Sequence, residues 1–474
     1  MTHTSRHLAR LGALAGISLF IACGSGDLTV PNYANPTPDA VTADPLTNLQ
    51  TRAAGVLNLA RRNLGWNSDA GIFGREAFSY GTDSRSTTNY LDAPAVDPGG
   101  LASGSWTGFF TTLRAIHDFV NAVDSTPAGV LSTAQVSGAK GFAHTMEALE
   151  LSYVISSRDS LGIPVDIASN AADITPFVTR DSAYNYIAAR LDLAKTELAA
   201  GGSAFVVKLN SGFTPFSTPA TFLKFNRALA ARINVYRASL GVTGCTSPRA
   251  STCYTTALQN LNESFIDQGQ ALSVGAYWIF SAAANDVANP QNVVTNTNLL
   301  LHPSIGPDAP HRADGTFDLR YQAKVRRLAT ARNLGTGGLS IPTDYAPNLY
   351  ATQATPAPIV KNEELFLLRA EARYFTGDAA GALADINYIR TTSGGLAPTS
   401  AFANDDAFIT ELLLQRRYSL LLEGHRWVDV RRLGKLNTLP IDIPARQFIA
   451  SRQPVPIAEC LARQGSKYPG PGCQ

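Results

Sequence analysis

The chain has 474 residues, of which 45% are hydrophobic and 16% are charged, so it can bury a large core and is not a disordered polypeptide. The formal net charge is +2 and no run of lysine or arginine forms a basic strip, which argues against nucleic acid as a partner. The 38 glycines and 27 prolines lie mostly between periodic segments, which predicts irregular loops on a helical frame.

The N-terminus has the features of an export signal. Arg6 and Arg10 precede a run of apolar or small residues, Leu11 to Ala22, that ends at Cys23. A helix of that run would be about 18 Å long, too short for a hydrocarbon core of roughly 30 Å. A basic start, a short apolar segment and a small residue at the cleavage point are typical of secretory signals. Because a cysteine follows directly, residues 1–22 resemble a bacterial lipoprotein signal peptide, with Cys23 as the lipidated first mature residue. The alternative is an ordinary export signal with an incidental cysteine.

A linker and a helix start separate the signal from the body of the chain. Residues 23–43 are small, polar and proline-bearing, so we expect a flexible tether there. Asp44 and Pro45 provide a cap and a first helical residue, and we expect a single folded domain over 44–474. No later stretch is long and apolar enough to predict a membrane span.

Six segments within residues 44–268 predict helices, because their apolar residues recur at the three- and four-residue spacing of one helical face. Residues 65–103 show no sustained period, and a stretch of that length inside a domain is usually functional or disordered. The six apolar faces are Ala53, Val56, Leu57, Ala60 and Leu64; Phe109, Leu113, Ile116, Val120 and Val123; Phe142, Met146, Leu149 and Tyr153; Ile187, Leu191, Ala194 and Leu198; Phe225, Leu229, Ile233, Tyr236 and Leu240; and Leu258, Leu261 and Phe265.

Four cysteines remain after Cys23, and they allow three pairings. The local pairing joins Cys245 to Cys253 and Cys460 to Cys473, and it closes two loops rich in small and polar residues. Export places the chain where disulfides persist, so we expect disulfides. A metal site is the alternative, but the gaps of seven and twelve residues match no zinc spacing and no histidine lies within the loops. We therefore predict no bound metal.

Residues 269–360 form the least regular part of the chain. An aromatic cluster at 277–280 is followed by a run rich in Asn, Thr and Pro. Asp308, Asp314 and Asp318 weakly suggest a calcium loop, but their spacing is not that of an EF-hand. A solvated turn is the favoured interpretation.

Two amphipathic helices joined by a very short turn are predicted after residue 361. Gly377 can end the first helix with left-handed dihedrals, and Asp378 can cap the second. Helices joined by so short a turn must pack antiparallel, as in a tetratricopeptide hairpin. A third helix follows. The three apolar faces are Leu365, Leu368, Ala372 and Phe375; Ala379, Ala382, Leu383, Ile386 and Ile389; and Ile409, Leu412, Leu413 and Leu420.

Two charged residues fall on the apolar face of the third helix. Arg416 lies on the face of Leu413, and Glu423 follows two turns later. Buried charges are costly unless they are paired, so the favoured interpretation is internal ion pairing that fixes this helix against its neighbours. The alternative is that Glu423 acts with His425 or Asp429 as acid and base, which needs a cleft that the sequence does not show.

An ordered set of motifs resembles the SusD/RagB family. The most specific run is RRYSLLLEGHRWVDVRRLGK at 416–435, preceded by EARYFTGD at 371–378 and ALADINYIR at 382–390. Four weaker matches occur in the same order as in the family. They are SWTGFFTTLRAIHDFVNAV at 105–123, FNRALAARINVYRAS at 225–239, FDLRYQAKV at 317–325 and PVPIAE at 454–459. Together these motifs span nearly the whole chain.

The resemblance implies a mainly α fold of tetratricopeptide-like helical pairs with a loop-rich variable part. The N-terminal helical part would be 44–268, the variable part 269–360, and the C-terminal hairpin and tail 361–474. Family members are outer-membrane lipoproteins that bind a nutrient at the cell surface and cover a TonB-dependent transporter. We therefore expect an oligosaccharide or peptide ligand and a SusC-like TonB-dependent transporter as partners, with no cofactor and no catalysis.

No binding residue carries over by motif, because family members differ in their loops. Aromatic loop residues can stack on sugar rings, and core packing is the alternative for each one. Trp106 and Trp427 lie within helical motifs and are assigned to the core. The ligand-binding candidates are Trp66, Tyr80, Tyr90, Tyr277 and Trp278.

Two other classes of function stay open at this point. One is a periplasmic helical-repeat scaffold that binds only proteins. The other is a secreted carbohydrate-active enzyme, because 37 acidic residues offer many carboxylate pairs. The sequence contains no nucleophile elbow, Walker loop, HExxH zinc motif or dinucleotide fingerprint, which favours a binding protein.

Overall fold

The computed structural model describes residues 44–83, 85–92, 94–103, 105–170, 173–245, 252–334 and 340–473. The predicted signal peptide and tether, with Cys23, lie outside these ranges, so those predictions are untested. The first described helix is α3 (Pro45–Arg62), and Asp44 caps it as expected, because the Asp44 carboxylate accepts the backbone N–H of Thr47 at 3.1 Å. Residues Leu49–Gln474 form one compact unit.

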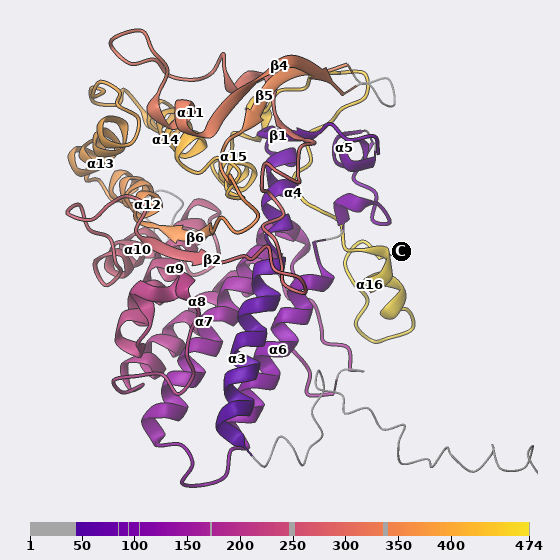
Figure 1. Cartoon of the computed structure of the whole chain (residues 1–474), viewed down its shortest axis with the longest axis vertical. Coiled ribbons are helices and arrows are strands. Elements are labelled where there is room, and N and C mark those ends of the chain that lie inside the picture. Colours follow the sequence, from indigo (N-terminus) through magenta and orange to yellow (C-terminus); the bar gives the residue numbers. More distant parts are fainter. Residues whose placement is uncertain are drawn as a thin grey trace, which may run out of the picture. The chain divides into compact units, whose positions relative to one another are not determined.

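A series of long helices follows the predicted apolar periods. Each helix packs against the next one along the chain, and Figure 1 shows them side by side. Ser132 and Gln135 form a reciprocal capping box at the start of the second of these helices, which satisfies two backbone donors. The helices are α6 (Thr107–Asp124), α7 (Thr133–Arg158), α8 (Arg180–Ala199), α9 (Pro219–Ser239) and α10 (Thr252–Asn262).

The predicted C-terminal hairpin extends this series. Helix α12 (Asn362–Phe375) packs on α10 and on α13 (Ala379–Thr392), and α14 (Asp405–Ser419) packs on both α12 and α13. Gly377 has φ of +93°, and the Asp378 carboxylate accepts the backbone N–H of Gly381 at 2.8 Å. The structure is therefore mainly α with tetratricopeptide-like pairs, as predicted.

The expectation of an irregular stretch at 65–103 is wrong in part. These residues form α4 (Gly65–Phe73), β1 (Ala77–Ser79), α5 (Arg85–Leu91) and a 3-10 turn, η1 (Leu101–Ser103). Tertiary packing orders them: the Phe73 ring stacks on Trp427 of α15 (Arg426–Arg432), with ring centroids 4.5 Å apart. Elements this short carry too few turns to show a period in the sequence.

Among the described residues there are three two-stranded antiparallel sheets, and each takes at least one strand from the variable part. Strand β1 pairs with β3 (Leu299–Leu301), β2 (Gly275–Trp278) with β6 (Ala357–Lys361), and β4 (Val325–Asn333) with β5 (Pro342–Pro347). The second sheet leads directly into α12. The remaining short helical elements are η2 (Asp159–Leu161), η3 (Ser211–Phe216), η4 (Pro303–Ile305), α11 (Leu319–Lys324), η6 (Leu436–Thr438) and α16 (Ile457–Ala462).

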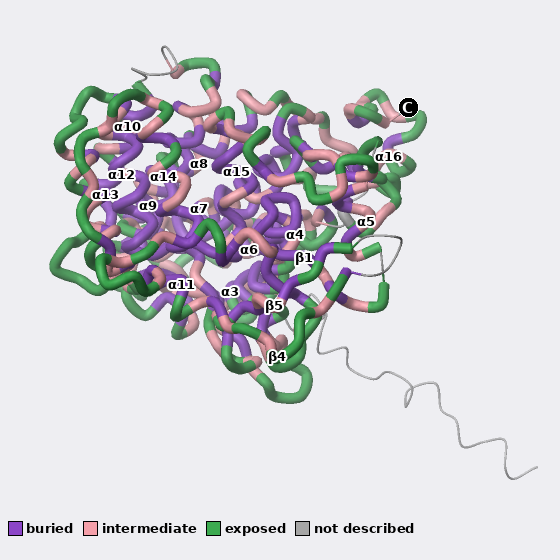
Figure 2. The backbone as a smooth tube through the Cα atoms, turned by 90° about the horizontal axis from the view of Figure 1, so that it is seen from above, coloured by how far each residue is buried: buried purple, intermediate pink, exposed green. Residues whose placement is uncertain are grey.

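Most of the described apolar side chains form one large core. Figure 2 shows buried residues along the packed helices and exposed residues mainly on the connecting loops. Trp106 and Trp427 are buried, as predicted, with 5% and 0% of their surface exposed. Within the described ranges, no helix combines the length and the apolar character needed to span a bilayer.

Both predicted disulfides are present. Cys245 bonds to Cys253, and Cys460 bonds to Cys473, so the local pairing is confirmed. The second disulfide ties α16 to the C-terminal tail.

Candidate functional site

The charged residues of the C-terminal motif form buried ion pairs. Arg416 of α14 donates to Asp429 of α15 at 2.7 Å, and Lys361 donates to Glu423 at 2.5 Å. The expected internal pairing is therefore confirmed. The placement of Glu423 on the third helix is wrong, because α14 ends at Ser419 and Leu422 adopts a left-handed φ of +57°.

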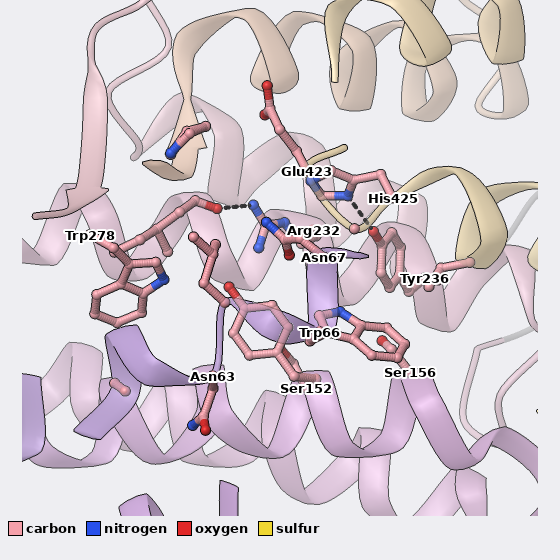
Figure 3. A pocket seen from close by; sticks show the side chains of 17 residues that line it. Asn63, Trp66, Asn67, Ser152, Ser156, Arg232, Tyr236, Trp278, Glu423 and His425 are labelled. Atoms are coloured by element: carbon pink, nitrogen blue, oxygen red, sulfur yellow. Dashed lines mark hydrogen bonds between the residues drawn. The ribbon is translucent and has the colours of Figure 1, made fainter. Parts of the chain in front are cut away.

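A small interior cavity adjoins this network (Figure 3). Its volume is about 30 Å³, which is room for roughly one water molecule. Arg232 donates to both carboxylate oxygens of Glu364, at 2.7 and 2.6 Å, and the Tyr236 hydroxyl lies 3.3 Å from Nδ1 of His425. A cavity of this size cannot admit a substrate. The side chains around it therefore have a structural role and hold neighbouring elements together.

The pKa values of the cavity residues fit that structural role. Burial lowers the pKa of His425 to about 4, so the ring is neutral near pH 7. Burial disfavours ionisation of Glu364, but the charge and hydrogen bonds of Arg232, with smaller contributions from His425 and Arg416, together outweigh it and hold the pKa of that carboxyl at about 2. Glu423 and Asp429 each face a cation instead of a cleft. The geometry does not support the acid–base alternative.

Two of the five predicted ligand residues line this interior cavity. Trp66 and Trp278 are each only 3% exposed. The Trp66 ring lies 6.0 Å from that of Trp427, and Trp278 meets Phe213 edge-on at 6.3 Å. A ligand could reach either indole only if the surrounding helices moved apart.

The other three predicted residues lie apart from that cavity. The Tyr80 hydroxyl donates to the carbonyl of Ile341 at 2.9 Å, and the Tyr90 hydroxyl donates to Asp69 at 2.6 Å, and both tyrosines are buried. Tyr277 is partly exposed because side chains alternate across β2, which turns Trp278 inward and Tyr277 outward. The structure does not gather the five aromatics into one site, and their role in binding stays a prediction.

A larger and more open depression lies elsewhere, between α6, residues 164–168 and 173–175, and α16. Its volume is about 550 Å³, and we call it the α6 groove. Trp106 and Phe110 form its aromatic floor, with ring centroids 4.6 Å apart, and Phe177 stacks on Trp106 at 5.9 Å. The charged side chains along it are Arg114, Asp166, Asp173, Glu459 and Arg463. Aromatic surface flanked by paired polar groups is typical of a small-molecule site.

One wall of the α6 groove is held in place by Arg463. Its guanidinium donates to Glu459 at 2.6 Å and to the carbonyl of Thr175 at 2.8 Å, and it lies 4.6 Å from the ring of Phe177. Glu459 in turn accepts the indole N–H of Trp106 at 3.2 Å. These contacts join α16, the loop and α6, so the groove has a defined shape.

The Cys460–Cys473 disulfide should keep this wall ordered. Replacing both cysteines with serine is expected to speed tryptic cleavage after Arg463 or Lys467 severalfold, because an open tail samples more unfolded conformations. Limited proteolysis followed by mass spectrometry measures the change. The double variant C245S/C253S is the matched control and should leave these two cleavage rates unchanged. Equal rates in wild type and C460S/C473S would contradict the prediction.

The sequence contained a signal for this groove that the apolar periods concealed. The predicted buried face of α6 runs through Phe109 and Leu113, and the groove is lined by the neighbouring face. That neighbouring face carries Phe110, Arg114 and His117 at helical spacing, which places an aromatic ring beside two polar side chains. Phe177 and Arg463 could not have been added from sequence, because only tertiary contacts bring them to α6.

The aspartates of the weak calcium pattern are engaged with the protein. Asp308 pairs with Arg417 at 2.6 Å, Asp314 pairs with Arg312 at 3.2 Å, and Asp318 pairs with Arg320 and caps α11. The described part of the chain contains no group of three metal-ligating side chains.

Comparisons with known proteins give one partial family match and a shared fold. The sequence model described as the SusD family matches residues 353–455, which hold the most specific motifs. No curated protein matches the sequence significantly. Among solved structures, a SusD superfamily protein from Bacteroides vulgatus is similar, with a TM-score of 0.64 and 15% identity over 88% of this chain and 97% of that one.

Two further structures extend the likeness. NanU from B. fragilis is similar with a TM-score of 0.64 and 14% identity, over 93% of this chain and 100% of that one. Surface glycan-binding protein A from Bacteroides thetaiotaomicron, solved in complex with laminarihexaose, is similar with a TM-score of 0.64 and 14% identity, over 90% of this chain and 99% of that one. At these identities the structures show a shared fold. The SusD/RagB resemblance is therefore confirmed: the chain carries a SusD family segment at 353–455 and has the SusD-like fold over most of its length.

Proposed function

We propose that this protein is a nutrient-binding lipoprotein of the cell surface that captures an oligosaccharide and passes it to a SusC-like TonB-dependent outer-membrane transporter. The observation that carries the proposal is the SusD-like fold together with the family match at 353–455. A relative of the same fold, surface glycan-binding protein A, was solved with laminarihexaose bound, which favours a glycan over a peptide. The lipid anchor would be at Cys23.

The α6 groove is the ligand site that the geometry favours. It is open, large enough for several sugar rings, and it offers the partly exposed Phe110 beside charged groups that can bind hydroxyls. Tyr277 is a second candidate because its ring is partly exposed. Trp66, Tyr80, Tyr90 and Trp278 would take part only after a rearrangement, because they are buried.

Phe110 provides the direct test of the groove. Replacing Phe110 with alanine is expected to weaken binding of a neutral oligosaccharide about tenfold, because the stacking surface is lost. Isothermal titration of the mature protein against a glycan and peptide panel, laminarihexaose included, measures the change. Phe402→Ala is the matched control, since Phe402 is a partly buried ring packed against Tyr374 and Phe408 in the C-terminal region.

The outcomes separate the candidate sites. Unchanged affinity in Phe110→Ala with a loss in Tyr277→Ala would move the site to β2. No binding to any panel member would contradict a nutrient-binding role and favour a protein-binding scaffold. Hydrolysis of a panel member would show an enzyme, which the proposal excludes.

Location and partner need a separate experiment in cells. Protease added to intact cells should cut the full-length chain, and a TonB-dependent barrel should copurify with it from detergent-solubilised membranes. A chain that is protected from the protease and copurifies with no barrel would favour the periplasmic scaffold.

A further inference from the structure

We infer that the α6 groove leads into a polar pocket that holds the terminal ring of a neutral, hydroxyl-rich oligosaccharide and rejects a ring that carries a carboxylate. This inference rests on the proposed function and adds the polarity of the ligand and the position of its end. It starts from a second cavity of about 260 Å³, which we call the end pocket.

The end pocket continues the α6 groove along the same helix. Phe110 and Arg114 line the groove, His117 and Asn121 line the end pocket, and Asp166 and Ile167 line both. Residues 106, 110, 114, 117 and 121 follow the three- and four-residue spacing of one helical face. From residue 106 to residue 121 the helix extends about 22 Å, so a ligand lying along it would be a chain of rings.

The size of the end pocket and the helices that line it suit one terminal unit. Its volume equals that of roughly nine water molecules at about 30 Å³ each, which is room for one sugar ring. Helix α7 closes it with His144 and Glu147, and α8 closes it with Tyr186 and Arg190. A chain entering from the open groove would therefore stop at this wall.

The wall is a preformed polar network. The Tyr186 hydroxyl donates to Glu147 at 2.9 Å, Arg190 lies 3.2 Å from the other Glu147 oxygen, and His144 Nδ1 contacts Glu197 at 2.7 Å. The Nε2 atom of His117 is buried and has no hydrogen-bond partner among the described residues. A buried polar atom without a partner is unfavourable, and a ligand hydroxyl would satisfy it once the His117 ring turns toward the pocket that it lines.

The charges of the lining residues determine which kind of sugar ring the end pocket accepts. Glu147 and Asp166 line the end pocket and Glu197 lies behind His144, while Arg190 is the only Lys or Arg among its lining residues. Burial raises the pKa of Glu147, which shows that its partners do not fully offset desolvation. Hydroxyl donors would be favoured next to these oxygens, whereas a carboxylate on the sugar would meet like charges.

Titration of the mature protein with matched probes tests the inference. The probes are neutral hexasaccharides, laminarihexaose among them, and the same chains with one glucuronyl ring at the end. We expect the neutral probe to bind at least tenfold more tightly. His117→Ala should lower the affinity for the neutral probe about tenfold. Glu147→Gln should raise the affinity for the acidic probe and so reduce the difference in affinity between the two probes. His311→Ala is the control, because His311 is exposed and packs against Phe317, outside this pocket.

Each outcome is decisive. If no oligosaccharide binds, both the proposed function and this inference are overturned. If oligosaccharides bind and Phe110→Ala weakens binding, but His117→Ala does not and Glu147→Gln leaves the affinity difference between the two probes unchanged, the groove stands and the end pocket is rejected. If the acidic probe binds as tightly as the neutral one, the charge selection is rejected. Circular dichroism confirms that each variant remains folded.

Discussion

Replacing Arg432 with methionine is expected to lower the free energy of unfolding by about 3–5 kcal/mol. Arg432 ends α15 and its side chain has no exposed surface. It donates to both carboxylate oxygens of Glu371 on α12, at 2.5 and 2.8 Å, and to Asp429 at 3.0 Å. It also lies 4.9 Å from the ring of Tyr236 on α9. One side chain therefore links three helices.

The expected loss comes from the charge that the substitution leaves behind. Methionine fills much of the same space, but among the described residues Glu371 would keep only the Tyr254 hydroxyl, at 3.1 Å, as its partner. Asp429 would still have Arg416. Urea-induced unfolding, followed by circular dichroism, measures the difference from wild type.

A surface ion pair provides the control for Arg432. Arg446 pairs with Asp92 at 2.6 Å, and about a third of its side chain is exposed. Arg446→Met should therefore change stability by less than about 1 kcal/mol. The double variant R432M/E371L, which removes the stranded charge as well, should recover much of the loss. A single Arg432→Met variant within 1 kcal/mol of wild type would show that the pair is not needed for stability.

His425 should make the protein less stable in mild acid. In the folded state burial lowers its pKa to about 4, against an ordinary value of 6.5. Between those values the unfolded chain binds a proton that the folded protein does not, so stability falls as the pH drops. From pH 7 to pH 4.5 the contribution of this one group is about 2–3 kcal/mol.

A substitution isolates the contribution of His425 from that of other groups. His425→Asn keeps an acceptor near the Tyr236 hydroxyl but cannot take up the proton. The variant should therefore lose less stability than wild type between pH 7 and pH 4.5, by about 2–3 kcal/mol. The control is His311→Asn, an exposed histidine. The same pH dependence in wild type and His425→Asn, measured by urea unfolding at both pH values, would contradict the assignment.

Much of the helical framework was predictable because its signals are local. In α6 to α10 and α12 to α14 the apolar residues recur three and four positions apart, and each helix has enough turns to show this spacing. The turn at Gly377 and Asp378 was predictable for the same reason, since a left-handed residue and a cap act within a few positions. The local disulfides were also predictable, because export and spacing decide them.

The site was harder to predict, because aromatic residues look alike in sequence whether they are buried or exposed. Trp66 and Trp278 were chosen as ligand residues in loops, and both lie in the core. Their burial depends on α4 and β2, elements too short to show a period. Phe110, which does line an open groove, was hidden beside the strong apolar face of its own helix.

The sequence by itself determined the class of fold, the order of the helical pairs and the presence of paired buried charges, because these follow from periodicity and from the cost of an unpaired charge. Only the tertiary structure decided which partners those charges have. Arg416 meets Asp429, and Lys361 meets Glu423 from 62 positions away. Tertiary contacts also decided where the open groove lies, since α6, Phe177 and Arg463 come together only when segments distant in the chain pack. The type and spacing of residues in a sequence indicate which side chains are buried, but the packing of distant segments determines which residues they contact.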